Sequence, residues 1–210
     1  MKTNVRKYTD KQLLDRVKSL DSFVKIPKKR WIIGVRSNED ATNVYDDKFY
    51  EYEGTKFIRV LTGTTNAGEG ILRGGFKRYN KKGTAILKAD EWYYNVWKWG
   101  YHRGRMTALR QRGSSVLVYR DGNMNGKAEE IGELTRGWYG INYHTNTYNF
   151  DPRNLKVVQW FIGNWSAGCQ VINDRVKYLE QMKYYRDAYI KGKQEYVTYC
   201  LLNEFDPDQK

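Results

Sequence analysis

The chain has 210 residues and a formal net charge of +13, from 37 Lys and Arg residues against 24 Asp and Glu residues. This length suffices for one domain with a substantial core, and the sequence holds no run of about 18 apolar residues that could span a membrane. The positive charge favours an anionic partner such as nucleic acid, anionic lipid or a bacterial wall polymer, and it excludes no fold. We expect a single domain over residues 1–210, with residues 1–30 as a helical N-terminal extension.

The first predicted element is a helix from about residue 9 to residue 20. Thr9 and Gln12 have the spacing of a capping box, and Leu13, Leu14, Val17 and Leu20 recur at helical spacing. After Pro27 the pattern changes to short segments that are rich in β-branched and aromatic residues. These segments predict strands at 31–35, 48–52, 56–61, 115–120, 138–144 and 195–202, and an extended segment at 157–162.

A glycine-rich stretch over residues 62–83 predicts loops with unusual backbone angles. It lacks the Gly-Lys-Ser/Thr ending of a phosphate-binding loop, so we reject that interpretation. A second helix is predicted over residues 174–191, with Asn173 as its N-cap and Gly192 at its end. The predicted fold class is therefore mainly β, with a helix near each end.

The segment from Asp121 to Gly126 has Asp, Asn and Asn at alternate positions, which is how a calcium loop begins. The twelfth position of such a loop would be Gly132, where a bidentate Glu is required. We favour a plain turn between two strands.

Two Cys and two His residues restrict the candidates for nucleophilic chemistry. Cys169 follows the small residues of Ser166-Ala167-Gly168, which allow a sharp turn, and it precedes an apolar segment. A thiol needs a lowered pKa or a nearby base to act as a nucleophile, and His144 ends the predicted strand 138–144. On composition alone, a buried core cysteine is also consistent with this pattern. Cys200 lies in an apolar segment and is predicted to be core.

The segments Gly140-Ile141-Asn142-Tyr143-His144 and Ser166-Ala167-Gly168-Cys169 resemble the catalytic core of the L,D-transpeptidase (YkuD-like) family. Over residues 90–175 the chain is similar to phage and prophage murein-hydrolase-type proteins, with further matching pieces at 100–104, 108–111, 118–121 and 162–171. The resemblance implies an L,D-transpeptidase-like β-sandwich or barrel with a Cys–His cleft.

The resemblance also implies roles for individual residues. Cys169 would attack a peptide carbonyl next to a D-centre in a peptidoglycan stem peptide, and His144 would accept the thiol proton. Backbone N–H groups around Gly168 and Cys169 would hold the oxyanion, and Ser166 would position the turn or the His. Substrate-binding positions in the cleft are expected at His102, Arg103, Tyr143 and Trp165.

Two departures from the family pattern concern substrate and transferase activity. Ala167 stands where the family has a His, and the interval of 25 residues between His144 and Cys169 suggests an inserted loop over residues 145–154. No metal is expected, since the His and Cys residues lack the spacing of a zinc site. No cofactor is expected either.

Three function classes remain open from the sequence. The first is a phage-type peptidoglycan hydrolase, an endolysin or a virion-associated enzyme, that acts as a cysteine peptidase of L,D-carboxypeptidase, endopeptidase or transpeptidase type. The second is a nucleic-acid-binding protein, although no zinc knuckle or RNP-like pattern supports it. The third is a catalytically inactive wall-binding or virion structural domain. For the first class we expect synthesis without a signal peptide, followed by release to the cell wall or packaging in a virion. The oligomeric state is not predicted.

Overall fold

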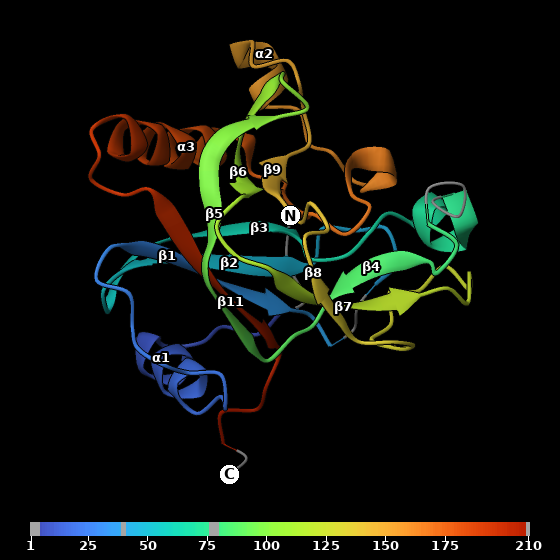
Figure 1. Cartoon of the computed structure of the whole chain (residues 1–210). Helices are drawn as coiled ribbons and strands as arrows, with labels where there is room; N and C mark the ends of the chain where they lie inside the picture. The colour runs from blue at the N-terminus through green and yellow to red at the C-terminus, as the bar shows by residue number, and fades with distance from the viewer. Residues whose placement is uncertain (1–4, 39–40, 76–79, 209–210) are drawn as a thin grey trace.

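The structure is a computed structural model that describes residues 5–38, 41–75 and 80–208. Within these residues the chain is β-rich, with two sheets and few helices (Figure 1). The strands are β1 (Arg30–Arg36), β2 (Asp47–Glu53), β3 (Lys56–Thr64), β4 (Thr84–Leu87), β5 (Glu91–His102), β6 (Met106–Gln111), β7 (Val116–Asp121), β8 (Thr135–Gly137), β9 (Tyr143–Thr145), β10 (Gln170–Ile172) and β11 (Tyr196–Asn203). The α-helices are α1 (Asp10–Lys18), α2 (Pro152–Leu155) and α3 (Arg175–Ile190).

The larger sheet closes into a barrel in the strand order β1-β11-β5-β6-β9-β10-β3-β2. Most neighbouring strands are antiparallel, whereas β1 with β11 and β9 with β10 are parallel pairs. The smaller sheet has the order β4-β7-β8 and lies beside the barrel (Figure 1). Because β9 and β10 are adjacent, the barrel brings the segment around residue 144 next to the segment around residue 170.

Aromatic side chains fill the interior of the barrel. Tyr199 packs on Trp97 with ring centroids 4.6 Å apart, and Phe49 and Tyr143 meet edge to face at 5.7 Å. Helix α3 adds its buried stripe of Tyr178, Met182 and Tyr185 to this same core. Aromatic residues contribute a large apolar area per side chain, which suits a barrel core built from short strands.

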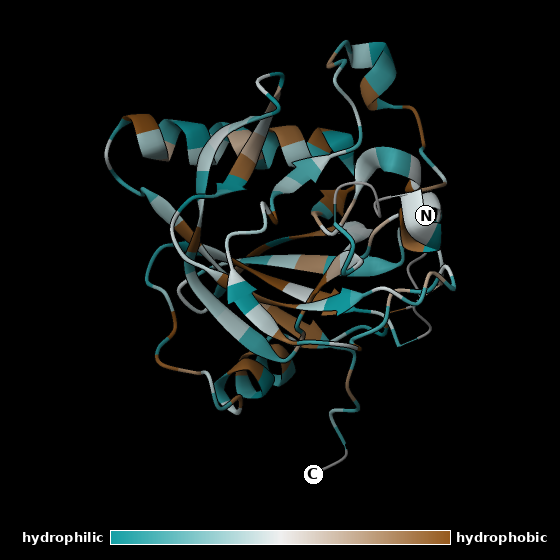
Figure 2. Ribbon diagram, turned by 45° about the vertical axis from the view of Figure 1, so that its right-hand side comes forward, coloured by the Kyte–Doolittle hydropathy of each residue, from teal (hydrophilic) through white to brown (hydrophobic). Residues whose placement is uncertain are grey.

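Helix α1 packs on the outer face of the barrel and forms a second core. Leu13 and Val17 are fully buried there against Trp31 and Trp92, while the polar face of the helix is exposed (Figure 2). The Thr9 side chain accepts a hydrogen bond from the backbone of Gln12, and the Gln12 side chain accepts one from the backbone of Thr9. The capping box predicted from the sequence is therefore confirmed.

Several predicted elements are confirmed with small changes at their ends. The predicted segments 31–35, 48–52, 56–61, 115–120 and 195–202 correspond to β1, β2, β3, β7 and β11. The helix predicted at 174–191 is α3, although its N-cap is Asp174 and not Asn173. The Asp174 side chain accepts a hydrogen bond from the backbone N–H of Lys177.

The strand predicted over residues 138–144 is wrong for most of its length. Only Tyr143 and His144 belong to β9, because Gly140 adopts a left-handed backbone (φ 72°) that a strand cannot continue through. The Gln111 side-chain oxygen accepts hydrogen bonds from the backbone N–H groups of Tyr139 and Ile141. This side chain replaces the neighbouring strand that an extended segment would have needed.

The extended segment predicted at 157–162 is also wrong, since it forms only an isolated bridge between Phe161 and Val44. Its apolar side chains at positions 157, 158, 160 and 161 are exposed instead of buried.

The segment from Asp121 to Gly126 is a turn after β7, in which Asn123 and Asn125 both hydrogen-bond to Glu129. None of the described helices is long and apolar enough to cross a membrane.

Candidate active site

The parallel pairing of β9 and β10 places Cys169 and His144 on the same side of the sheet. In the register of this pair, Tyr143 lies opposite Gln170 and His144 lies opposite Val171. Side chains alternate along a strand, so Cys169, Val171 and His144 share the outer face while Tyr143 and Gln170 point into the barrel. Cys169 lies two residues before Val171, which is the partner of His144 on the neighbouring strand. This offset corresponds to about 8 Å between the α-carbons of Cys169 and His144, a distance that two side chains on the same face can bridge.

His144 is held as a neutral base. Its side chain is 1 % exposed, and Nδ1 lies 2.7 Å from the backbone oxygen of Thr145. A carbonyl only accepts, so Nδ1 carries the proton and Nε2 carries a lone pair. Nε2 is buried and has no hydrogen-bond partner within the described chain. Burial, followed by the proximity of His102, lowers the pKa of His144 to about 3, so the ring stays neutral at physiological pH.

His102, at the end of β5, covers one face of His144. The two rings stack with centroids 4.3 Å apart and an interplanar angle of 21°. The Asn142 side-chain nitrogen lies 3.1 Å from Nδ1 of His102, which fixes the orientation of this second ring. Burial, together with the positive charges of Arg103 and Arg110, lowers the pKa of His102 to about 4. The stacked pair is therefore uncharged, and each ring would oppose protonation of the other.

The turn before Cys169 depends on Ser166 and Gly168. Ser166 Oγ donates to the backbone oxygen of Cys169 at 2.8 Å and accepts the N–H of Gly168 at 3.1 Å. Gly168 has a backbone φ of 119°, and a Cβ there would lie 2.4 Å from the backbone oxygen of Ala85. Only glycine fits this combination of angle and close approach. The small residues before Cys169 are thus required by the turn.

The Cys169 thiol is uncharged at rest and contacts the backbone of Gly140. Its Sγ lies 3.5 Å from the backbone oxygen of Gly140. Burial raises the pKa of Cys169 to about 11, while a hydrogen bond from the Asn142 backbone and the charge of Arg103 act in the opposite direction. No hydrogen bond joins Cys169 to His144 in the part of the chain that the structure describes. The resting state is a neutral thiol beside a neutral imidazole.

The donors available to an oxyanion differ from those expected. The Gly168 N–H donates to Ser166 Oγ and is not free for a substrate. The backbone N–H of Cys169 donates to none of the described residues, and the next amide, that of Gln170, donates to the backbone oxygen of Asn142. The Cys169 amide is therefore the candidate oxyanion donor, with the cationic side chain of Arg103 close enough to influence the thiol.

Tyr143 is not a substrate-binding residue, contrary to the sequence-based expectation. Its side chain is fully buried in the barrel, and its hydroxyl donates to Gln181 at 2.7 Å. The reason is the alternation of the strand, since the residue next to an outward His144 must point inward. Adjacency to His144 along the sequence therefore does not place Tyr143 beside it in space.

The other expected binding residues lie around the thiol. Arg103 is exposed at the tip of the hairpin between β5 and β6, with a positive φ of 50°. Trp165 is half-buried and packs on Tyr148 with ring centroids 5.1 Å apart, and Arg105 lies 4.8 Å above the Tyr148 ring. The hairpin tip and the loop after β9 are therefore in contact with each other through Arg105 and Tyr148.

The loop after β9 is anchored by the buried Arg175 of α3. Its guanidinium donates to the side chain and backbone oxygens of Asn146 and to the backbone oxygen of Asn154. The loop suggested for residues 145–154 is thus tied at both ends to one side chain. Such an anchor restricts the position of His144, which directly precedes the loop.

Sequence reasoning missed Asn142, Tyr148 and Arg105 as parts of this site. Asn142 had a detectable signal, because it lies two residues before His144 and so shares its face of the strand. Tyr148 and Arg105 had none, since their contact depends on how a loop packs on a hairpin tip.

No group of three or more His, Cys, Asp or Glu side chains is suitable for a metal ion among the described residues. Cys200 is buried in the core beneath α1.

Comparison with protein-family models, with curated proteins and with solved structures found no match.

Proposed function

We propose that this protein is a cysteine peptidase of L,D-transpeptidase-like fold that acts on peptidoglycan stem peptides through Cys169 and His144. The observation that supports it most strongly is the state of His144, which is buried and neutral and has its Nδ1 proton held by Thr145. This arrangement leaves an unpartnered Nε2 lone pair on the same face as a partly exposed thiol. A core histidine would normally have both ring nitrogens satisfied.

The chemistry begins from neutral groups. With thiol and imidazole pKa values of about 11 and about 3, a resting thiolate–imidazolium pair is strongly disfavoured. Proton transfer from Cys169 to Nε2 of His144 would accompany attack of the sulfur on the substrate carbonyl. For this transfer the Cys169 thiol would leave the Gly140 oxygen and donate to Nε2 of His144 instead. Bound substrate would favour this change by occupying the space beside the turn.

The covalent steps balance through one proton. The S–C bond forms as His144 takes the thiol proton, and the C–N bond then breaks as His144 returns that proton to the leaving amine. Water, or an acceptor amine, attacks the thioester and gives its proton to His144. The C–S bond breaks, and the proton passes back to Cys169. Hydrolysis and transpeptidation differ only in the acceptor.

The proposal includes the phage-type function expected from the sequence. The protein would be an endolysin that is released to the wall, or a virion-associated enzyme that is injected. A catalytically inactive wall-binding domain is the second candidate, and the raised pKa of the Cys169 thiol is the observation that favours it.

Digestion of purified sacculi tests the proposal. Soluble products are identified by mass spectrometry for the parent protein, Cys169→Ala and the matched control Cys200→Ala, in which a core thiol is removed instead. We expect stem-peptide fragments with the parent and with Cys200→Ala, and none with Cys169→Ala. Intact sacculi with all three proteins would support the inactive domain, and products with Cys169→Ala would exclude the thiol mechanism.

A further inference from the structure

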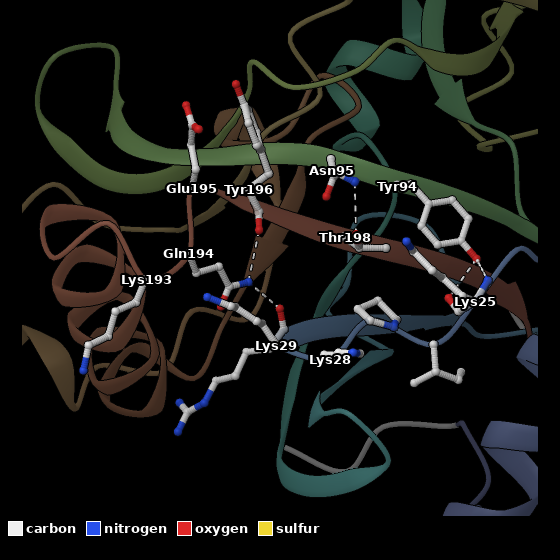
Figure 3. Close-up of a pocket in the computed structure, with 13 residues that line it drawn as sticks. Lys25, Lys28, Lys29, Tyr94, Asn95, Lys193, Gln194, Glu195, Tyr196 and Thr198 are labelled. Atoms are coloured by element: carbon white, nitrogen blue, oxygen red, sulfur yellow. Dashed lines mark hydrogen bonds between the residues drawn. The ribbon is translucent and has the colours of Figure 1, made fainter.

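A cavity of about 570 Å³ lies between the segment that follows α1 and the start of β11 (Figure 3). Its lining comes from residues 25–30, from β5 at Tyr94 and Asn95, and from residues 193–196 with Thr198. It shares no residue with the candidate active site. The volume is sufficient for a segment of several sugar or polyol units.

The cavity is cationic. Five cationic side chains and one acidic side chain line it. Lys25, Lys28, Lys29 and Lys193 are exposed, and none forms an ion pair with a residue that the structure describes. The acidic residue, Glu195, is already paired with Lys98 at 2.8 Å. Four exposed ammonium groups around one cavity without counter-charge create a positive potential that an anion would relieve.

Arg30, the fifth cation of the lining, is already bound by other side chains of the protein. It lies 3.9 Å from both Glu51 and Glu53, and its guanidinium stacks over the Tyr184 ring at 3.5 Å. Arg30 therefore stabilises the wall of the cavity, and the free positive charge comes from the lysines.

Neutral polar groups in the cavity are also available to a ligand. Asn95 has a left-handed backbone (φ 53°) where the pairing of β5 with β11 shifts register, and its side-chain amide bonds to none of the described residues. A bulge with a strained non-glycine residue often serves to re-aim a side chain. Gln194 is 7 % exposed, and its Oε1 lacks a hydrogen-bond partner in the described chain. Both groups suit hydroxyl-bearing ligands.

Aromatic stacking on a nucleobase is poorly provided for. The Tyr94 ring is stacked on Trp92 at 5.1 Å and 7°, so one of its faces is covered. Its hydroxyl accepts a hydrogen bond from the backbone N–H of Val24. It is also bonded to the backbone of Lys25 (Figure 3). Single-stranded nucleic acids bind through exposed aromatic faces that alternate with cations. Tyr196, the other aromatic residue of the lining, has the Lys98 ammonium 5.7 Å from its ring centroid. Each aromatic ring of the lining is thus partly engaged by the protein itself, whereas the four lysines form no ion pair with a described residue.

We propose that this cavity binds a phosphodiester segment of a polyol-phosphate polymer of the bacterial envelope. Phosphates match the four free lysines, and the hydroxyl groups between them match Asn95 and Gln194. The choice of an envelope polymer rests on the proposed function, and it would hold a peptidase on its wall substrate through a site remote from Cys169.

The test measures binding of defined poly(glycerol phosphate) chains to the Cys169→Ala protein by isothermal titration calorimetry. The pocket variant is Lys28→Gln/Lys29→Gln/Lys193→Gln. The control variant is Lys18→Gln/Lys56→Gln/Lys127→Gln, which removes the same charge from exposed lysines elsewhere. We expect at least a tenfold loss of affinity in the pocket variant and less than a twofold loss in the control. The slope of log affinity against log salt should fall by about two to three in the pocket variant only.

Equal losses in both variants would show attraction to net charge and overturn the proposal. Tighter binding of oligo(dT) with the same number of phosphates, lost in the pocket variant, would assign the cavity to nucleic acid and also overturn it. Sacculus digestion by the parent protein, set beside polymer binding by Cys169→Ala, separates the two proposals. Digestion by the parent with no polymer binding by Cys169→Ala would reject only the cavity, and polymer binding with no digestion by the parent would reject only the peptidase.

Discussion

Replacing His144 by Gln should reduce the acid sensitivity of this fold. The pKa of His144 falls from 6.5 in the unfolded chain to about 3 in the folded protein. The unfolded state therefore binds a proton more readily, and the free energy of unfolding decreases as pH falls below 6.5. At pH 5 the unfolded histidine is almost fully protonated and the folded one is not. The linkage relation then gives a loss of about 2 kcal/mol relative to pH 7.5.

Urea denaturation at pH 7.5 and pH 5.0, followed by tryptophan fluorescence, measures this difference. The parent should lose about 2 kcal/mol more between the two pH values than His144→Gln. His102→Gln is a comparison variant: the pKa of His102 is also lowered, to about 4, but its contribution is reduced by solvent because the ring is only partly buried. If the parent and His144→Gln lost equal stability, His144 would titrate normally, and the buried neutral base would be refuted.

Three further outcomes follow from the geometry of the thiol and its turn. Alkylation of Cys169 by iodoacetamide should increase about tenfold per pH unit from pH 7 to pH 10, since its pKa is raised to about 11. A rate plateau below pH 7 would instead reveal a thiolate–imidazolium pair. Gly168→Ala should destabilise the protein by more than about 3 kcal/mol, whereas Gly140→Ala, where a Cβ meets open space, should cost only about 1–2 kcal/mol in thermal or urea unfolding. Tyr143→Phe removes the hydrogen bond to Gln181 and should cost about 1 kcal/mol of stability. Its KM should be unchanged, and a raised KM would return Tyr143 to the binding site.

The sequence predicted those elements whose stability depends on residues close together in the chain. The α1 helix was readable because capping and an apolar stripe coincide within Thr9 to Leu20. Strands β1, β2 and β3 could be predicted because they follow one another as antiparallel neighbours and are rich in β-branched and aromatic residues. Strand β5 was missed despite its length, because its aromatic run fits a buried helix as well as a buried strand.

The closure of the barrel was not readable, because it depends on two parallel pairings between segments distant in the sequence. The same limit applied to the site. The small residues before Cys169 indicated a turn. The structure gives the reason at Gly168, where a Cβ would collide with the backbone oxygen of Ala85. The stack of His102 on His144 required knowing that the end of β5 lies over β9. Two histidines separated by 42 positions give no such signal.

Capture of the acyl-enzyme tests the central claim most directly. The protein is mixed with a soluble stem peptide, quenched in acid during turnover and examined by intact-protein mass spectrometry, with peptide mapping of any adduct. The account predicts a thioester equal in mass to the acyl part of the cleaved peptide, on Cys169 alone, released by hydroxylamine and absent from Cys169→Ala. Stem-peptide cleavage that proceeds without any adduct on Cys169, and persists in Cys169→Ala, would contradict it.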